Sequence, residues 1–259
     1  MPPGFNELFR RRAALVEELL GKHVLPVFHL DNTGGPTFEG SCVAVTARGS
    51  YFVVSAAHAL DATSNGGVHL LLNGREQNPL QNPTWATVTT RPESRADDLV
   101  DLGYVRLNDD EIQAIGSANF LQLVEDEQPP NRQWASHHIV RGFPANRQSR
   151  DDVRMQYNLT QSYYFAPELP IGKYRESKLS HDSHFAMNFD HRRIRSPGGQ
   201  GGKPNFFGMS GGGAWVIDPY ADYSAANYPQ FVGFLVGKAP RNGKVVFGSR
   251  VRMFFEILA

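Results

Sequence analysis

The sequence predicts an all-β fold, and two observations lead to this prediction. Short runs rich in β-branched and aromatic residues recur along most of the chain, and turn residues separate them. Helical spacing of apolar residues is confined to the two ends, and no internal repeat is present. Many short strands with few helices favour a β-barrel or a β-sandwich.

The elements are expected in the following order. Residues 5–20 carry apolar side chains at helical spacing, and Gly21 is a natural stop, so an amphipathic helix should precede the β domain and pack on it. Strands are expected at residues 23–30, 37–47, 50–60, 67–73, 84–90, 102–108, 137–144, 153–165, 184–190, 213–218, 230–239 and 244–251. Residues 250–259 predict a short closing helix, 125–133 a linker and 195–205 a flexible glycine-rich loop.

Composition narrows the function classes. The 259 residues include 26 Lys and Arg and 26 Asp and Glu, so the net charge of zero gives no basic excess for nucleic acid or an anionic membrane. Cys42 is the only cysteine, so an internal disulfide is excluded and a reducing compartment is favoured. No run of about 20 apolar residues is present. We expect a soluble and cytoplasmic protein.

Three residues, in the order His, Asp, Ser, carry the candidate chemistry. His58 follows the apolar run "YFVVSAA", Asp101 opens the run "DLGYVRL", and Ser210 stands within "GMSGGG". A serine hydroxyl needs a base within hydrogen-bond reach, and histidine titrates near neutrality. A carboxylate on the other ring nitrogen fixes the tautomer. The apolar pattern after Asp101 favours it over Asp97 and Asp98 as the acid.

The glycines around Ser210 fit the same chemistry. The backbone N–H groups of Gly208 and Ser210 are candidates for an oxyanion hole, and such a turn favours residues without a Cβ. "GMSGG" also matches the nucleophile elbow of α/β-hydrolases, but that fold needs a histidine after the serine, and none follows His191. The subtilisin order has an aspartate before the histidine. Asp31 fits that order, but the strand after Ser210 does not fit a helical site.

The motifs "SAAHAL", "DLGYVRL" and "GMSGGG" together resemble the active-site motifs of chymotrypsin/trypsin-like serine peptidases. The resemblance implies two antiparallel six-stranded β-barrels with an added N-terminal α-helix. It divides the chain into residues 1–22, a first barrel at 23–124 and a second barrel at 125–259. It also implies that His58 is the general base, Asp101 the orienting acid, Ser210 the nucleophile, and Gly208 with Ser210 the oxyanion donors.

Departures from the family pattern indicate a subgroup. Met209 stands where the digestive and clotting enzymes have the aspartate that pairs with a new N-terminus after zymogen cleavage, so that activation device is absent. Ala59 replaces a disulfide cysteine. The chain therefore resembles bacterial, disulfide-free, intracellular members. We expect a regulated serine endopeptidase acting through an acyl-enzyme, with a protein or peptide substrate, a possible regulatory protein partner, and no cofactor.

Substrate preference is expected to depend on the strand after the serine. The resemblance implies that Val236, Gly237 and Lys238 line the substrate pocket, with residues 205–209 as its other wall. Lys238 either favours an acidic substrate residue or points to solvent. The spacing of "HDSH" at 181–184 is a weak metal motif, and no metal site is expected. A catalytically silent peptide-binding module and an esterase are the alternative functions.

Overall fold

The computed structural model describes residues 19–61, 67–72, 75–76, 85–88, 98–125, 137–151, 156–190, 194, 206–217, 228–239 and 242–259. Most of the expected N-terminal helix, the 195–205 loop and nearly all of the 125–133 linker lie outside these residues. The described chain begins with a helical turn at residues 19–21, which ends at Gly21 as expected.

The first half of the chain forms one antiparallel sheet with two very short additions. Its strand order is β5-β4-β1-β2-β3-β7-β6, and β8 pairs in parallel with β2. The strands are β1 (Val24–Leu30), β2 (Pro36–Ala47), β3 (Ser50–Ala56), β4 (His69–Leu72), β5 (Arg75–Glu76), β6 (Trp85–Val88), β7 (Leu102–Arg106) and β8 (Leu121–Gln122). The six strands expected in this half are therefore present, and the two-residue strands β5 and β8 are additional to them.

The second half forms a six-stranded antiparallel barrel. Its strand order is β12-β9-β14-β15-β16-β13, and a bridge between Glu168 and Met187 joins the two ends. The strands are β9 (His137–Gly142), β12 (Ser162–Pro167), β13 (His184–Asn188), β14 (Gly213–Ile217), β15 (Gln230–Ala239) and β16 (Asn242–Arg250), with a separate hairpin of β10 (Ser149–Asp151) and β11 (Gln156–Asn158). The all-β prediction is confirmed.

Besides the helical turn at 19–21, the described residues contain four α-helices. They are α2 (Ala57–Asp61), α3 (Asp109–Ile115), α4 (Ile171–Glu176) and α5 (Val251–Ile257), with 3₁₀ turns at Ser117–Asn119 and Ala145–Arg147. The closing helix was expected. The strand expected at 50–60 ends at Ala56 instead, and its last residues form α2. Helix α3 carries a capping box in which Asn108 and Glu111 each accept from the other's backbone N–H.

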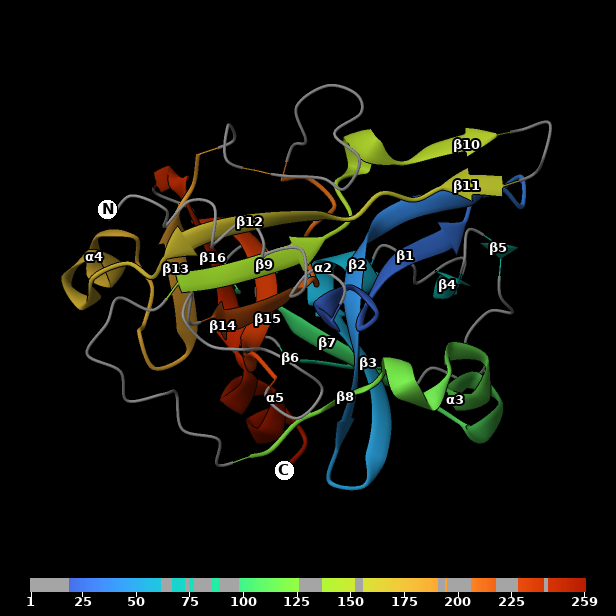
Figure 1. Ribbon diagram of the computed structural model, residues 1–259, viewed down its shortest axis with the longest axis horizontal. Helices are drawn as coiled ribbons and strands as arrows, with labels where there is room; N and C mark the ends of the chain where they lie inside the picture. The colour runs from blue at the N-terminus through green and yellow to red at the C-terminus, as the bar shows by residue number, and fades with distance from the viewer. Residues whose placement is uncertain are drawn as a thin grey trace.

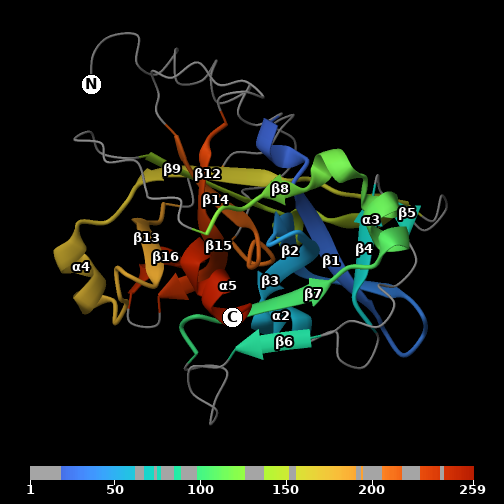
Figure 2. The same cartoon turned by 90° about the horizontal axis from the view of Figure 1, so that it is seen from below.

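The two sheets lie side by side, and a shared apolar core joins them. In Figure 1 the barrel strands of the second half lie to the left and most first-half strands lie to the right. The β10–β11 hairpin lies at the upper right, above β1, and α2 lies near the junction. Figure 2 shows α5 between the two halves. The Phe254 ring of α5 contacts Phe52 of β3 at 5.5 Å and Phe234 of β15 at 5.8 Å between centroids. Burial of these rings fixes how the sheets dock.

Candidate active site

The structure brings His58 and Asp101 together. His58 lies in the short helix α2, directly after β3, and its Nδ1 forms a short hydrogen bond with Asp101 Oδ2. The backbone N–H of His58 donates to Asp101 Oδ1 at 3.0 Å. The Asp101 side chain is 5% exposed, whereas that of His58 is 46% exposed. The acid is therefore shielded from water while the imidazole remains open to a substrate.

The backbone of Asp101 is held in an uncommon conformation. Its φ of 42° lies in the left-handed region, which aspartate tolerates better than most residues. Its carbonyl accepts from Ala57 N at 2.8 Å, so the chain turns just after the last β3–β7 pair, Ala56 with Leu102. Asp98 is also buried, but its Oδ1 accepts from Val100 N. This geometry favours Asp101 over Asp98 as the partner of His58; Asp97 lies outside the described residues.

Side chains from the second barrel hold the segment in front of Asp101. His184 of β13 donates from Nε2 to the carbonyl of Leu99 at 3.0 Å. Ser249 of β16 donates from Oγ to the carbonyl of Val100 at 2.5 Å. Both side chains are almost fully buried, and burial lowers the pKa of His184, which favours its neutral form. The acid is thus placed partly by the opposite barrel.

Ser210 lies in the turn before β14, and this turn docks on β2 of the first barrel. The carbonyl of Ser210 accepts from Ser41 N at 2.9 Å. A Cβ placed on Gly40 would lie 3.1 Å from that carbonyl oxygen and 3.3 Å from the Cβ of Ala59, the neighbour of His58. Gly40 therefore lies between the serine turn and α2, close to both. The backbone of Ser210 thus lies close to the helix that carries His58.

Two glycines in this turn are required by their surroundings. Gly208 has φ 84°, and a Cβ there would lie 2.5 Å from a Phe38 ring carbon. Gly211 has φ 82°, and its Cβ would lie 1.9 Å from the Ser41 carbonyl oxygen. Separations below 3.0 Å are not seen for real Cβ atoms. Both positions combine a left-handed backbone with no room for a side chain.

The backbone N–H groups of the turn divide into two sets. Those of Met209, Gly211 and Gly212 donate to the carbonyls of Phe206, Leu235 and Met209. In the part of the chain that the structure describes, the N–H groups of Gly208 and Ser210 donate to no protein acceptor. The carbonyl of Phe207 accepts from Ala145 N at 2.7 Å. In a trans peptide the C=O and N–H groups point in opposite directions, so Gly208 N–H points away from Ala145.

Met209 anchors the turn through apolar contacts. It is fully buried in a cluster with Val140, Phe206, Ala214 and other residues of the second barrel. A Cβ on Gly142 would lie 2.9 Å from the Cα of Met209, so β9 packs directly against the turn. Burial of the thioether side chain of Met209 therefore anchors the serine turn in the second barrel.

The three residues predicted for the substrate pocket have different surroundings. Val236 is 7% exposed and packs into a buried cluster with Leu169 and Tyr174, so its side chain faces the core. Gly237 is half-buried, and a Cβ there would meet no atom within 4 Å. Lys238 is exposed, and its Nζ lies 5.2 Å from the centroid of the Phe189 ring.

Phe189 links Lys238 to the serine turn. It packs edge-to-face on Phe206 at 5.1 Å between centroids. Phe206 is buried, whereas its neighbour Phe207 is 81% exposed. Lys238 and Phe207 are thus a cationic and an aromatic side chain presented near the turn that carries Ser210.

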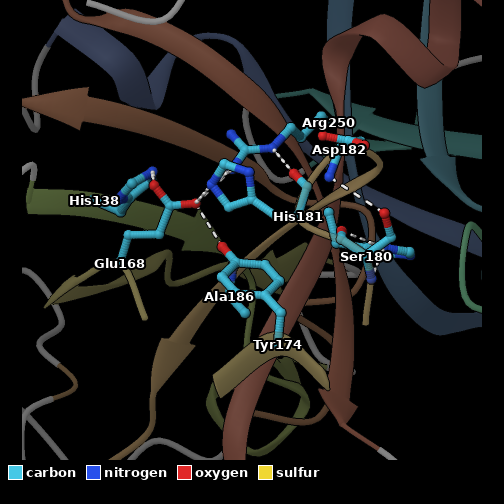
Figure 3. Close-up of polar contacts among 9 residues, drawn as sticks. His138, Glu168, Tyr174, Ser180, His181, Asp182, Ala186 and Arg250 are labelled. Atoms are coloured by element: carbon cyan, nitrogen blue, oxygen red, sulfur yellow. Dashed lines mark hydrogen bonds and ion pairs between the residues drawn. The ribbon is translucent and has the colours of Figure 1, made fainter. Parts of the chain in front are cut away.

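A separate polar cluster lies in the second barrel (Figure 3). Glu168 accepts from Arg250 and from the Tyr174 hydroxyl at 2.5 Å each, and His138 Nε2 lies 3.7 Å from its other oxygen. Burial alone would raise the pKa of Glu168, but nearby His138, Arg250 and Tyr174 outweigh it and lower the pKa. His181 Nε2, from the "HDSH" motif, lies 3.8 Å from Glu168 Oε1.

Two further expectations concern metals and the cysteine. The described residues contain no group of three or more His, Cys, Asp or Glu side chains that could hold a metal ion. Cys42 is a free, fully buried thiol that donates to the Leu25 carbonyl, and burial raises its pKa. Cys42 is thus a small core residue. No helix among the described residues is long and apolar enough to cross a membrane.

Sequence reasoning missed the residues that support the site. The serine turn and the segment before Asp101 accept hydrogen bonds from four such residues, Ser41, Ala145, His184 and Ser249. A serine between Gly40 and the apolar run 42–45 is a polar residue in a buried strand, and this was the available signal for Ser41. Nothing in the sequence reveals its partners, which lie 102 and 167 residues away.

Comparison with known proteins identifies the fold. No family model matches the chain, and no curated protein matches it. HL collagenase, a trypsin-like serine protease, is 14% identical with a TM-score of 0.55, and the match covers 93% of each chain. The active form of the Rv3671c protease from M. tuberculosis is 15% identical with a TM-score of 0.44, covering 94% of this chain and 82% of that one. At this identity the likeness to HL collagenase shows the fold: the chain adopts the chymotrypsin/trypsin-like double β-barrel.

Proposed function

We propose that the protein is a serine endopeptidase that cleaves peptide bonds through His58, Asp101 and Ser210. The observation that carries the proposal is the His58–Asp101 pair, set beside a serine turn whose Gly208 and Ser210 N–H groups have no acceptor among the described residues. The fold supports it, because this double barrel is the scaffold of HL collagenase.

The proposal gives each group a role. An ionised carboxylate only accepts hydrogen bonds, so the bond to Asp101 places the proton of neutral His58 on Nδ1. Nε2 then has a lone pair for the Ser210 hydroxyl proton. Ser210 Oγ attacks the peptide carbonyl carbon, and the carbonyl oxygen becomes an oxyanion facing the N–H groups of Gly208 and Ser210. Collapse releases the amine, which takes the proton from His58, and leaves an acyl-enzyme.

Water completes the reaction by the same route. His58 removes a proton from water, the resulting hydroxide attacks the acyl ester, and Ser210 leaves with the proton returned by His58. Every proton moves through one imidazole, and no metal or organic cofactor takes part. We further propose that Gly237 and Lys238 contact the substrate, that Val236 contributes through its backbone, and that the enzyme acts in the cytoplasm under the control of a protein partner.

The proposal is tested with a fluorophosphonate probe, which forms a covalent bond with an activated serine. Intact mass spectrometry of the wild type should show one adduct, and Ser210→Ala and His58→Ala should show none. Ser117→Ala is the matched control, because Ser117 is an exposed serine in a 3₁₀ turn and its removal should leave labelling unchanged. A peptide library digested in parallel should be cleaved by the wild type and not by Ser210→Ala or His58→Ala.

Other outcomes identify the alternatives. A folded wild type that takes no probe and binds peptides without cleaving them is a silent binding module. A wild type that takes the probe and hydrolyses small esters but no peptide is an esterase. Either result overturns the proposal of an endopeptidase.

A further inference from the structure

We propose that Ser41 is a positioning residue that holds the oxyanion hole in its working shape from the opposite barrel. The inference rests on the proposed function and adds a residue that neither the triad nor the oxyanion donors include. Ser41 belongs to β2, and its contacts join that strand to the serine turn and to the end of β9.

The Ser41 hydroxyl makes two hydrogen bonds whose directions are fixed by chemistry. The N–H of Phe143 donates to Oγ at 2.8 Å, and the hydroxyl proton then goes to the carbonyl of Gly208, also at 2.8 Å. Ser41 is fully buried, so water does not compete for either bond. A buried hydroxyl with one donor and one acceptor in place has a single orientation.

The backbone of Ser41 adds two more bonds. Its N–H donates to the carbonyl of Ser210 at 2.9 Å, and its own carbonyl accepts from Ser55 Oγ at 2.7 Å. The carbonyls of both proposed oxyanion donors, Gly208 and Ser210, are therefore bound by the same residue. The Ser55 hydroxyl in turn donates to the Ser41 carbonyl rather than to either of these two carbonyls.

Gly208 is the residue that most needs this support. It has φ 84°, and glycine reaches more backbone conformations than any other residue. The peptide before it is held by Ala145 N on the Phe207 carbonyl, and the peptide after it by Ser41 Oγ. With both flanking peptides bound, φ and ψ of Gly208 are fixed, and so is the direction of its N–H. Without the Ser41 hydroxyl, the second peptide keeps only the longer bond from Met209 N to the Phe206 carbonyl, at 3.2 Å.

Removing the hydroxyl should lower the rate of the chemical step rather than substrate binding. In Ser41→Ala the buried Phe143 N–H and Gly208 carbonyl lose their partner. We expect a shift of the 208–209 peptide that relieves this loss to move Gly208 and, with it, the adjoining 207–208 peptide that carries the Gly208 N–H. We expect kcat to fall about 10- to 100-fold with KM nearly unchanged. This loss is smaller than the roughly 100- to 1,000-fold loss that follows removal of an oxyanion donor itself.

Ser55→Ala is the matched control. It also deletes one fully buried serine hydroxyl that bonds a backbone carbonyl, but that carbonyl belongs to Ser41 and not to the serine turn. Both variants should lose similar thermal stability, and Ser55→Ala should keep kcat within about threefold of wild type. The readouts are kcat and KM on a cleaved peptide and the second-order rate of labelling by the fluorophosphonate, whose phosphoryl oxygen occupies the oxyanion hole. If either alanine variant fails to fold, Ser41→Cys and Ser55→Cys give the same comparison with a weaker hydrogen-bonding group.

The outcomes separate this inference from the proposed function. A selective loss of kcat and of labelling rate in the Ser41 variant supports it. If wild type is active and the Ser41 and Ser55 variants show equal kcat, the inference is overturned and the endopeptidase stands. If KM rises in the Ser41 variant while kcat holds, Ser41 shapes binding, and the inference is also overturned. A folded wild type that neither cleaves peptide nor takes the probe overturns both.

Discussion

Replacing Asp101 by asparagine tests the triad with little change in shape. Asparagine tolerates a left-handed backbone, here φ 42°, and its Oδ1 can still accept from the His58 backbone N–H now at 3.0 Å. Its Nδ2, however, replaces the oxygen that accepts from the imidazole, and Nδ2 is a donor. His58 Nδ1 must then become the acceptor, so the neutral ring carries its proton on Nε2, where it cannot take the proton of Ser210.

The expected loss is large and confined to the chemical step. The same exchange in a trypsin-type triad lowers kcat by about 10⁴-fold, which corresponds to about 5 kcal/mol of transition-state stabilisation. KM should change little, because Asp101 is 5% exposed and does not reach the substrate. Thermal stability should stay close to wild type, since the carboxamide fills the same space.

Steady-state hydrolysis of a cleaved peptide at pH 7–8 measures this effect, and Asp98→Asn is the matched control. Asp98 is an equally buried aspartate three residues earlier, and its Oδ1 accepts from the Val100 N–H. It should keep activity within a few-fold of wild type. Asp101→Asn activity above about a tenth of wild type, or an equal loss in Asp98→Asn, would refute the assignment of the acid.

Three more changes have defined outcomes. Gly208→Ala places a Cβ 2.5 Å from the Phe38 ring in a backbone with φ 84°. Labelling by the fluorophosphonate should therefore slow by more than about 100-fold, and the melting temperature should fall. Labelling at the wild-type rate would contradict the oxyanion role. Glu168→Gln should cost about 1–3 kcal/mol of stability at pH 7, measured by thermal unfolding. Because the folded pKa of Glu168 is lowered, that contribution is present above its unfolded pKa and lost as pH falls through the folded pKa, so the two melting curves should converge in acid, and a constant gap would argue against this linkage. Lys238→Glu should weaken cleavage beside acidic substrate residues relative to basic ones in matched peptides; an unchanged ratio would place Lys238 outside the substrate site.

The strands and the candidate triad could be predicted because their signals are local. Alternation and turn residues mark the strands of both barrels, and the order of His58, Asp101 and Ser210 on an all-β pattern excluded two other hydrolase folds. Helix α3 could also have been found, because Asn108 and the acidic residues 109–111 form a capping signal that was not used.

The remaining features depend on contacts that have no local signal. Residues 57–61 continue an apolar run, and only the pairing of Ala57 N with the Asp101 carbonyl shows why the strand stops and a helix begins. The burial of the Val236 side chain depends on α4, an element the sequence analysis did not expect. The role inferred for Ser41 depends on partners in the other half of the chain.

The bonds from His184 and Ser249 to the carbonyls before Asp101 have a consequence for protein synthesis. A chain leaving the ribosome presents His58 and Asp101 early and Ser210 later, but the Val100 carbonyl has no donor from residue 249 until β16 has emerged. Strand β16 also lies between β15 and β13, so the second barrel cannot close without it. The nascent chain therefore carries His58, Asp101 and Ser210 before β16 holds the segment in front of Asp101, and the proposed proteolytic activity should appear only after β16 has folded.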